Sequence, residues 1–189
     1  MRNEFLRKAV HIMVGIFLLL LLRSGFLNYT VLILMLILSL CIYIFTKNQI
    51  PFVSRLIEIV DRGERIHGKG AVTYILGVIL VYVFFNDNLQ ILGASIIILA
   101  FGDGFAGIIG KYFGESKLPF NKRKSYEGLL AGILFSFFGA LFFVPPMPAF
   151  VVSVVISIIE SLPIRLGKIE FDDNLFIPIL SAIILWALM

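Results

Sequence analysis

Seven long apolar segments, separated by short charged or turn-forming stretches, dominate the pattern of hydrophobic and polar positions along this chain. They are residues 5–22, 29–46, 70–85, 89–110, 127–144, 147–162 and 174–189. A helix of about 20 apolar residues crosses the hydrocarbon core of a bilayer. The pattern therefore predicts an all-α polytopic membrane protein with about seven transmembrane helices, folded as a single domain over residues 1–189.

The stretch between the second and third segments has a different pattern. Its sequence, PFVSRLIEIVDRGERIH over residues 51–67, begins with Pro51 at a helix-start position and alternates apolar and charged residues with helical spacing. Such a pattern is typical of an amphipathic helix that lies in the membrane interface. We therefore expect one cytoplasmic interfacial helix beside the transmembrane bundle.

Composition and charge support a membrane protein and orient it. Hydrophobic residues make up 60% of the chain, and the mean hydropathy of +1.03 is too high for a soluble core of this size. With the N-terminus in the cytoplasm, the cytoplasmic segments hold fifteen of the sixteen Lys and Arg residues, and only Arg23 lies outside. The positive-inside rule therefore places the charged chemistry on the cytoplasmic face of a multi-pass protein, in a cell or endoplasmic-reticulum-type membrane.

An aspartate lies inside the fourth apolar segment, in the sequence FGDGFAGIIG. A carboxylate within a membrane helix costs about 2.5–3.5 kcal/mol on insertion scales, so Asp103 is expected to face a partner, an ion or a polar cavity. Gly107, Gly110 and Gly114 follow it on the same helix face. A glycine stripe is often a helix-packing face. Next to a carboxylate, it also suits the close approach of a Mg²⁺ ion bound to phosphate.

The loop after this segment, KLPFNKRKSYEG, is rich in cations. Its candidate phosphate-binding residues are Lys117, Lys122, Arg123, Lys124 and Ser125. A basic cluster beside a membrane is also typical of an orientation signal or a site for anionic lipid headgroups. Glu127 opens the next helix, where the helix N-terminus favours a carboxylate, and it is a candidate second metal ligand beside Asp103.

Further polar residues lie near the ends of other predicted helices. Glu160 ends the sixth segment, and Asp172, Asp173 and Asn174 precede the seventh. These residues are either helix caps and interfacial side chains, or carboxylates that meet as a metal or base site.

The first helix and the start of the third offer two more groups of polar residues. In the first helix, Arg7 and Lys8 are cations that can extend to the membrane surface, and Arg7 and His11 are candidate phosphate or substrate contacts. GERIHGKG, residues 63–70, is close to a P-loop, but Gly70 stands where the Ser or Thr that meets Mg²⁺ is required. We therefore reject the P-loop and keep two interpretations of Lys69, a flexible turn or a nucleotide contact.

The order of these motifs resembles a known family. The matching segments are RKAVH (7–11), GKGAVTY (68–74), FGDGFAGIIGKYFG (101–114), LPFNKRKSYEG (118–128), and IES (159–161) with DDNLFIP (172–178). They resemble the CTP-dependent polyprenol kinases, which include dolichol kinases, phytol kinases and a CTP-using diacylglycerol kinase. The resemblance implies a fold of membrane helices and phosphorylation of a lipid alcohol with CTP and a divalent cation such as Mg²⁺.

The resemblance also implies residue roles. Residues implied to hold nucleotide and metal are Asp103, Lys124, Ser125, Glu127, Glu160, Asp173 and Asn174. We expect Mg²⁺ on Asp103 and Glu127, and we nominate Asp173 as the base that deprotonates the lipid hydroxyl, with Glu160 as the alternative. Expected partners are CTP, an isoprenoid or other lipid alcohol and the bilayer. No nucleic acid is expected, and the oligomeric state is left open, a homodimer included.

Three alternatives to an isoprenoid-alcohol kinase remain. The polyprenol kinases are similar to phosphatidate cytidylyltransferases, which make CDP-lipids, but the DRxD signature of those enzymes is absent from this sequence. A CTP-dependent diacylglycerol kinase would share the same motifs. Outside the enzymes, a small ion-coupled transporter would use intramembrane acids, but it needs polar groups on both membrane faces, and the charges here lie on one. The sequence does not identify the lipid.

Overall fold

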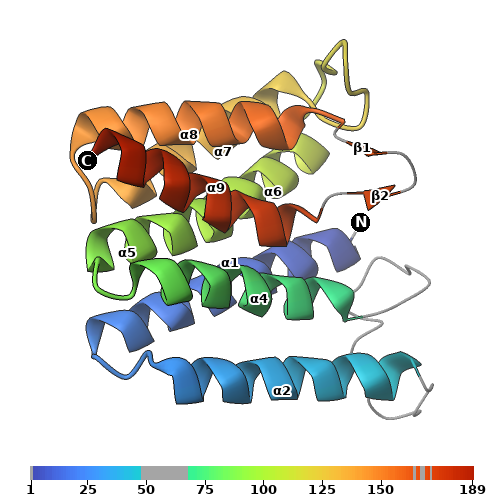
Figure 1. The fold of residues 1–189 in the computed structure, drawn as a ribbon. Coiled ribbons are helices and arrows are strands. Elements are labelled where there is room, and N and C mark those ends of the chain that lie inside the picture. Colours follow the sequence, from blue (N-terminus) through green and yellow to red (C-terminus); the bar gives the residue numbers. More distant parts are fainter. Residues whose placement is uncertain (1, 48–67, 164, 167–168, 171) are drawn as a thin grey trace.

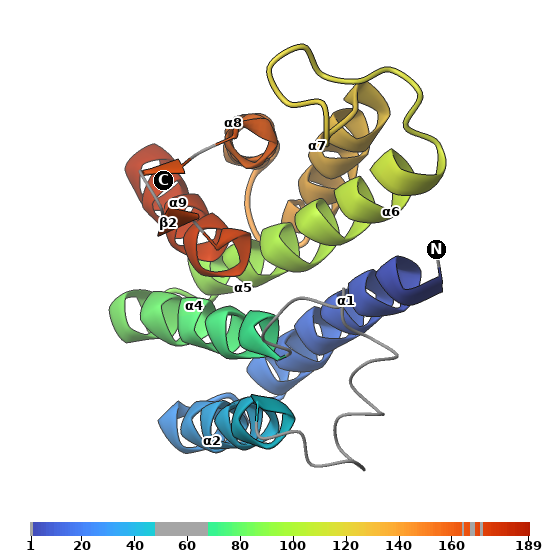
Figure 2. The same cartoon turned by 90° about the vertical axis from the view of Figure 1, so that its right-hand side faces the viewer.

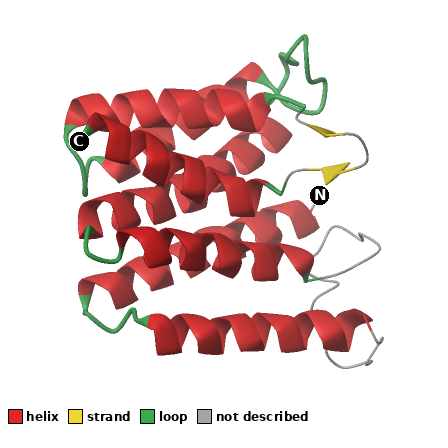
Figure 3. Ribbon diagram, in the orientation of Figure 1, coloured by secondary structure: helices red, strands yellow, loops and turns green. Residues whose placement is uncertain are grey.

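Helices account for nearly all of the regular structure in the computed structural model, which describes residues 2–47, 68–163, 165–166, 169–170 and 172–189 (Figure 3). The helices are α1 (Arg2–Arg23), α2 (Tyr29–Lys47), α4 (Lys69–Phe85), α5 (Leu89–Ile97), the π-helical turn η1 (Ile98–Asp103), α6 (Gly104–Tyr112), α7 (Tyr126–Ala140), α8 (Pro146–Ser161) and α9 (Asp173–Leu188). Two short strands, β1 (Arg165–Leu166) and β2 (Ile169–Glu170), pair antiparallel between α8 and α9.

Each of the seven apolar segments forms helix, and α5, η1 and α6 together form one of them. By length and composition, three helical stretches could cross a membrane: Glu4–Arg23, Tyr29–Thr46 and Leu89–Tyr112. The other four, α4, α7, α8 and α9, are apolar but have only 15–17 residues. The all-α fold and the membrane character therefore agree with the sequence, whereas seven spans stay a prediction. The expected interfacial helix over 51–67 lies outside the described residues.

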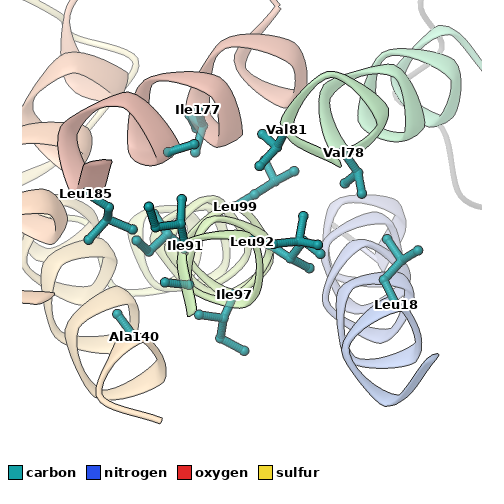
Figure 4. Packing of buried hydrophobic residues seen from close by; sticks show 14 of the residues in the cluster. Leu18, Val78, Val81, Ile91, Leu92, Ile97, Leu99, Ala140, Ile177 and Leu185 are labelled. Atoms are coloured by element: carbon teal, nitrogen blue, oxygen red, sulfur yellow. The ribbon is translucent and has the colours of Figure 1, made fainter. Parts of the chain in front are cut away.

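The helix Leu89–Tyr112 is the centre of the bundle. In an 18-residue apolar stretch of this helix, 72% of the residues are buried, against 22% in α1 and 17% in α2. Figure 4 shows its buried side chains among those of the surrounding helices, with labels on Leu18, Val78, Val81, Ile91, Leu92, Ile97, Leu99, Ala140, Ile177 and Leu185. Because the turn η1 within this helix contacts α1, α7, α8 and α9, Asp103 at the end of that turn is held in place from several sides.

The most peripheral helix is α2. Among the described helices it packs chiefly on α4, and Figure 2 shows it set apart from the rest of the bundle. It exposes large apolar side chains along its length, including Ile33, Leu34, Ile37 and Leu38. Exposed apolar surface of this extent is expected of a helix that faces lipid.

Polar segments gather at one end of the bundle. The N-terminus, β1, β2 and the yellow loop between α6 and α7 lie at the same end in Figure 1, whereas the C-terminus lies at the other. The starts of α4 and α9 face this polar end as well, since Asn174 of α9 bonds to Gly70 of α4. The fold thus brings together the motifs that the sequence scatters over six segments.

Candidate active site

A cavity of about 1780 Å³ lies at the polar end. With the exception of Glu127, every predicted site residue lines it: Arg7, His11, Lys69, Asp103, Lys117, Lys122, Arg123, Lys124, Ser125, Glu160, Asp173 and Asn174. Pockets for one small ligand usually measure about 300–1,000 Å³. The cavity is therefore large enough for two substrates at once.

Asp103 lies at the inner wall of the cavity, where the π-helical turn η1 ends. π-Helical turns inside α-helices are frequent at functional sites. The carboxylate is 6% exposed and accepts a hydrogen bond from Lys8, with 2.5 Å between Nζ and Oδ1. Its other oxygen lies 3.4 Å from Nε2 of His11. That nitrogen also lies 3.1 Å from the carbonyl oxygen of Leu99, which can only accept, so Nε2 is the protonated ring nitrogen.

Lys8 is the functional candidate that sequence analysis missed. Its position in an N-terminal helix indicated a cation that reaches the membrane surface, but its side chain is 4% exposed and turns inward to Asp103. A methyl group at Gly107 would overlap the end of the Lys8 side chain, so glycine leaves room for the lysine where it crosses α6. The available signal was the spacing of Lys8 and His11, one turn apart on one face of α1.

The three glycines that follow Asp103 have two roles, one at the cavity wall and one in packing against α7 and its cap. Gly107 leaves room for Lys8 at the cavity wall, as described above. Gly110 meets α7, since a Cβ there would lie 3.3 Å from Cα of Gly128, and Gly114 packs against Ser125. Close packing of α6 on α7 therefore explains Gly110, and contact with the residue that caps α7 explains Gly114.

Lys124 and Glu160 form a second ion pair on the cavity wall, with 2.5 Å between Nζ and Oε1. Burial lowers the pKa of Lys124, but the carboxylates of Glu160, Asp103 and Asp173 outweigh it, so that the pKa is raised above its ordinary value. The lysine is therefore a permanent positive charge with three carboxylates around it. Asn121 fixes the same loop to α8 by donating to the carbonyl oxygen of Ser161.

The starts of three helices, α4, α7 and α9, border the cavity. Ser125 caps α7 by accepting a hydrogen bond from the backbone N–H of Gly128, and Asp172 caps α9 in the same way through Asn174. Lys69 at the start of α4 lies 3.8 Å from Asp172. Helix N-termini carry partial positive charge and free N–H groups, so this end of the cavity favours phosphate.

Glu127 is the predicted site residue that the structure does not bring to the cavity. Its Oε1 accepts a hydrogen bond from the backbone N–H of Ser116, 3.0 Å away, which fixes the start of the basic loop. Its Oε2 is buried and has no hydrogen-bond partner among the described residues. Metal binding by Asp103 and Glu127 together stays a prediction.

The carboxylates of the cavity fit a metal that arrives on a nucleotide. Within the described part of the chain, no three His, Cys, Asp or Glu residues are placed to hold an ion by themselves. Mg²⁺ commonly takes only one or two protein carboxylates and completes its shell with phosphate oxygens and water. Asp173 lines the cavity and forms no ion pair with a described residue, whereas Asp103 is already neutralised by Lys8. Asp173 is therefore the more accessible ligand.

Comparison with known proteins agrees with the motifs. The chain is 32% identical over 143 residues to phytol kinase 1, chloroplastic, of Arabidopsis thaliana, covering 67% of this chain and 46% of that protein. It is 31% identical over 137 residues to farnesol kinase, chloroplastic, of the same plant, covering 65% and 43%. An uncharacterized protein of Methanocaldococcus jannaschii, MJ1137, is 30% identical over 200 residues, covering 97% and 93%.

This chain belongs to the polyprenol and phytol kinase family. It spans less than half the length of the two plant kinases that it matches. No protein-family model matches the chain, and no solved structure does.

Proposed function

We propose that this protein transfers the terminal phosphate of CTP to a membrane isoprenoid alcohol of the phytol, geranylgeraniol or dolichol type, giving the alcohol monophosphate. One observation carries the proposal. Twelve of the thirteen predicted site residues line a single cavity that has a cationic end, and all of the twelve except Lys117 come from the family's motif segments. The names of the plant relatives, phytol kinase and farnesol kinase, support a prenyl alcohol as the acceptor.

The cationic end suits the phosphates of the nucleotide. Lys117, Lys122 and Arg123 are exposed at the cavity wall, and Lys124 stays charged through its ion pair with Glu160. Phosphoryl transfer relies mainly on positioning and on stabilising the charge that builds on the transferred group. Fixed cations and helix N-termini supply that stabilisation.

Asp173 is our candidate base. In the transfer, a bond forms between the lipid oxygen and the γ-phosphorus, the bond from that phosphorus to the bridging oxygen breaks, and CDP leaves. The hydroxyl proton passes to the carboxylate of Asp173. Glu160 is the weaker candidate because its Oε1 is engaged by Lys124, whereas Asp173 is in no ion pair with a described residue.

A divalent cation, expected to be Mg²⁺, would neutralise charge on the phosphate oxygens. Asp173 is available to hold such an ion, and the expected ligand Asp103 would first have to release Lys8. The exposed cations Lys117, Lys122 and Arg123 and the helix starts would neutralise the phosphates, and the two ion pairs would help to position them.

We further propose that all seven apolar helical segments cross the membrane, with the N-terminus and the cavity on the cytoplasmic side. The four shorter helices would then require the bilayer to become thinner around them. At 1.5 Å per residue, the 15 residues of α7 span about 22 Å, less than the roughly 30 Å of the hydrocarbon core. Because α4, α7, α8 and α9 have their polar ends at the cavity, the site would lie below the membrane surface, where lipid hydroxyl groups are found.

The direct test is product identification. Purified protein in lipid nanodiscs would be given phytol or geranylgeraniol, Mg²⁺ and one nucleoside triphosphate at a time. We expect the alcohol monophosphate by mass spectrometry with CTP and much less with ATP, GTP or UTP. Diacylglycerol as acceptor distinguishes the diacylglycerol kinase alternative. Turnover of diacylglycerol alone, or none with any alcohol, would contradict the proposal.

A further inference from the structure

The cavity has an apolar arm that phosphoryl transfer does not use. Six apolar side chains line it: Val10 and Val14 of α1, Met35, Leu38 and Ile42 of α2, and Ile75 of α4. None of them is charged, and the one hydroxyl group from α2 on this lining, that of Ser39, donates to the carbonyl oxygen of Leu36 within its own helix. The arm therefore offers an occupant apolar contacts and no unpaired polar group from these side chains.

The arm is lined by residues of α1 and α2 that are also exposed on the outside of the bundle. Among the described helices α2 packs chiefly on α4, so the two walls of the arm come from helices that are not packed tightly together (Figure 2). Val10 and Leu38 line the cavity and are still 38% and 62% exposed. Val10 and Leu38 therefore mark a side of the cavity that the described residues leave open toward the lipid-facing surface.

Two helices of the arm, α1 and α4, change from polar to apolar in the same direction. On α1, Arg7, His11 and Val14 follow one another on one face at spacings of four and three. On α4, Lys69 at the polar end is followed by Tyr74 and then by apolar residues. The arm thus begins where the cationic end of the cavity stops.

A buried hydroxyl group marks the junction of the two parts. Tyr74 is 3% exposed, and its hydroxyl has no hydrogen-bond partner among the described residues. Its ring meets the edge of the His11 ring, with 4.7 Å between centroids. Tyr74 and His11 therefore lie between the Asp103 carboxylate and the apolar arm. In a bound lipid alcohol, the hydroxyl end would lie on one side of these two residues and the apolar tail on the other.

We propose that the arm between α1, α2 and α4 binds the isoprenoid tail of the substrate, with the hydroxyl group directed to the Asp103 and Lys124 end. This inference rests on the proposed function. A lipid alcohol that moves within the bilayer would enter sideways between α1 and α2 and would not have to cross water. Burial of an apolar chain against apolar side chains supplies the binding free energy.

Depth along the arm predicts selectivity for chain length. Ile42 lies beside Gly68 and hence near the polar end, since a Cβ at Gly68 would be 3.7 Å from its Cγ2. Met35 is seven residues, or about 10 Å, farther along the same helix. A large side chain at Met35 would shorten the arm, whereas one at Ile42 would narrow its beginning.

Three tryptophan variants of the full chain in nanodiscs test this geometry with farnesol and the longer phytol. For Met35→Trp we expect the KM for phytol to rise about tenfold and the KM for farnesol to change less, because a methylene group in an apolar pocket changes specificity by about tenfold or more. Ile42→Trp should raise both values. Leu34 of α2 is 59% exposed and does not line the cavity, so Leu34→Trp is the matched control and should change the KM of neither alcohol. The KM for CTP should stay constant in all three variants.

The outcomes separate the two proposals. If wild-type protein phosphorylates prenyl alcohols but Met35→Trp and Leu34→Trp behave alike, the arm is not the tail site, while the proposed function stands. If wild type phosphorylates neither alcohol, the function is wrong, and photolabelling with a diazirine-bearing phytol then tests the arm by itself. Labelling at Met35 and Ile42 that phytol competes away, and phosphatidylcholine does not, would support it. Equal competition by phosphatidylcholine would refute it.

Discussion

Lys8 and Asp103, 95 positions apart in the sequence, form a buried ion pair with 2.5 Å between Nζ and Oδ1. The pair joins the first helix to the π-helical turn of the central helix. It also determines which charge is presented to the cavity, because a lone carboxylate there would repel nucleotide phosphates. Both family motifs, RKAVH and FGDG, thus meet at one contact.

Removal of the lysine tests whether this contact supports the fold, the chemistry or both. Lys8→Met leaves a buried carboxylate without its cation, and breaking a buried pair from one side typically costs about 3–5 kcal/mol. We expect a lower unfolding temperature and loss of activity. The double variant Lys8→Met/Asp103→Leu should regain stability and stay inactive. Recovery of activity in the double variant would show that the pair serves the fold alone.

Asp173 is the most direct test of the base assignment. Asp173→Asn should lower kcat at least about a hundredfold, in the range of a lost general base, with no change in unfolding temperature. Asp172→Asn is the matched control, because Asp172 caps α9 and lies near Lys69. Its variant should lose stability modestly and keep most of its activity. Near-normal turnover in Asp173→Asn would remove that residue from the mechanism.

The Lys124–Glu160 pair predicts a pH effect. A group whose pKa is raised on folding stabilises the folded protein. This stabilisation is fully present below the pKa of the group in the unfolded chain, and it is lost as the pH rises through the pKa in the folded protein. For Lys124 that loss begins only above its ordinary pKa of 10.5. Glu160→Gln removes the largest influence that raises this pKa, while burial still lowers it. The KM for CTP should then begin to rise at a lower pH than in wild type.

Profiles of KM for CTP against pH check this expectation. Glu115→Gln is the control, since Glu115 is exposed and does not line the cavity among the described residues. Its profile should follow wild type. Identical profiles for Glu160→Gln and wild type would mean that Lys124 does not contact the nucleotide in its charged form.

Cysteine accessibility tests the proposed topology. After Cys41→Ala removes the single native cysteine, a cysteine at Ser116 should react with an impermeant reagent only in permeabilised cells. A cysteine at Asp87, in the turn between α4 and α5, should react in intact cells. The reverse pattern would overturn the cytoplasmic placement of the cavity.

The helices were predictable because each one coincides with a continuous apolar stretch of the sequence. The predicted segment 70–85 differs by one residue at its start from α4 (Lys69–Phe85), and the predicted 29–46 differs by one residue at its end from α2 (Tyr29–Lys47). Span number was harder to predict, because helix length alone does not separate a short span from a helix that ends inside the bundle. The polar end of the bundle followed from charge placement.

The contacts of the site were less predictable because they depend on packing between distant segments. No local sequence signal marks the π-helical turn Ile98–Asp103. From the sequence alone, Lys8 resembles an ordinary interfacial cation, and only the packing of α1 on α6 shows its inward position. Gly110 lines the cavity but also contacts Gly128 of α7, a packing role that the sequence alone did not separate from room for an ion. Glu127 fits a metal ligand by its place in the motif, but its Oε1 is bonded to Ser116.

The fate of the CTP phosphates distinguishes a lipid-alcohol kinase from a CDP-lipid synthase. CTP labelled at either the γ- or the α-phosphate would be incubated with the protein, Mg²⁺ and phytol or geranylgeraniol, with phosphatidate as the competing acceptor. We expect γ label in the lipid phase as alcohol monophosphate and α label in water-soluble CDP. If α label instead enters the lipid phase with phosphatidate and pyrophosphate is released, the protein is a CDP-lipid synthase and the kinase assignment is wrong.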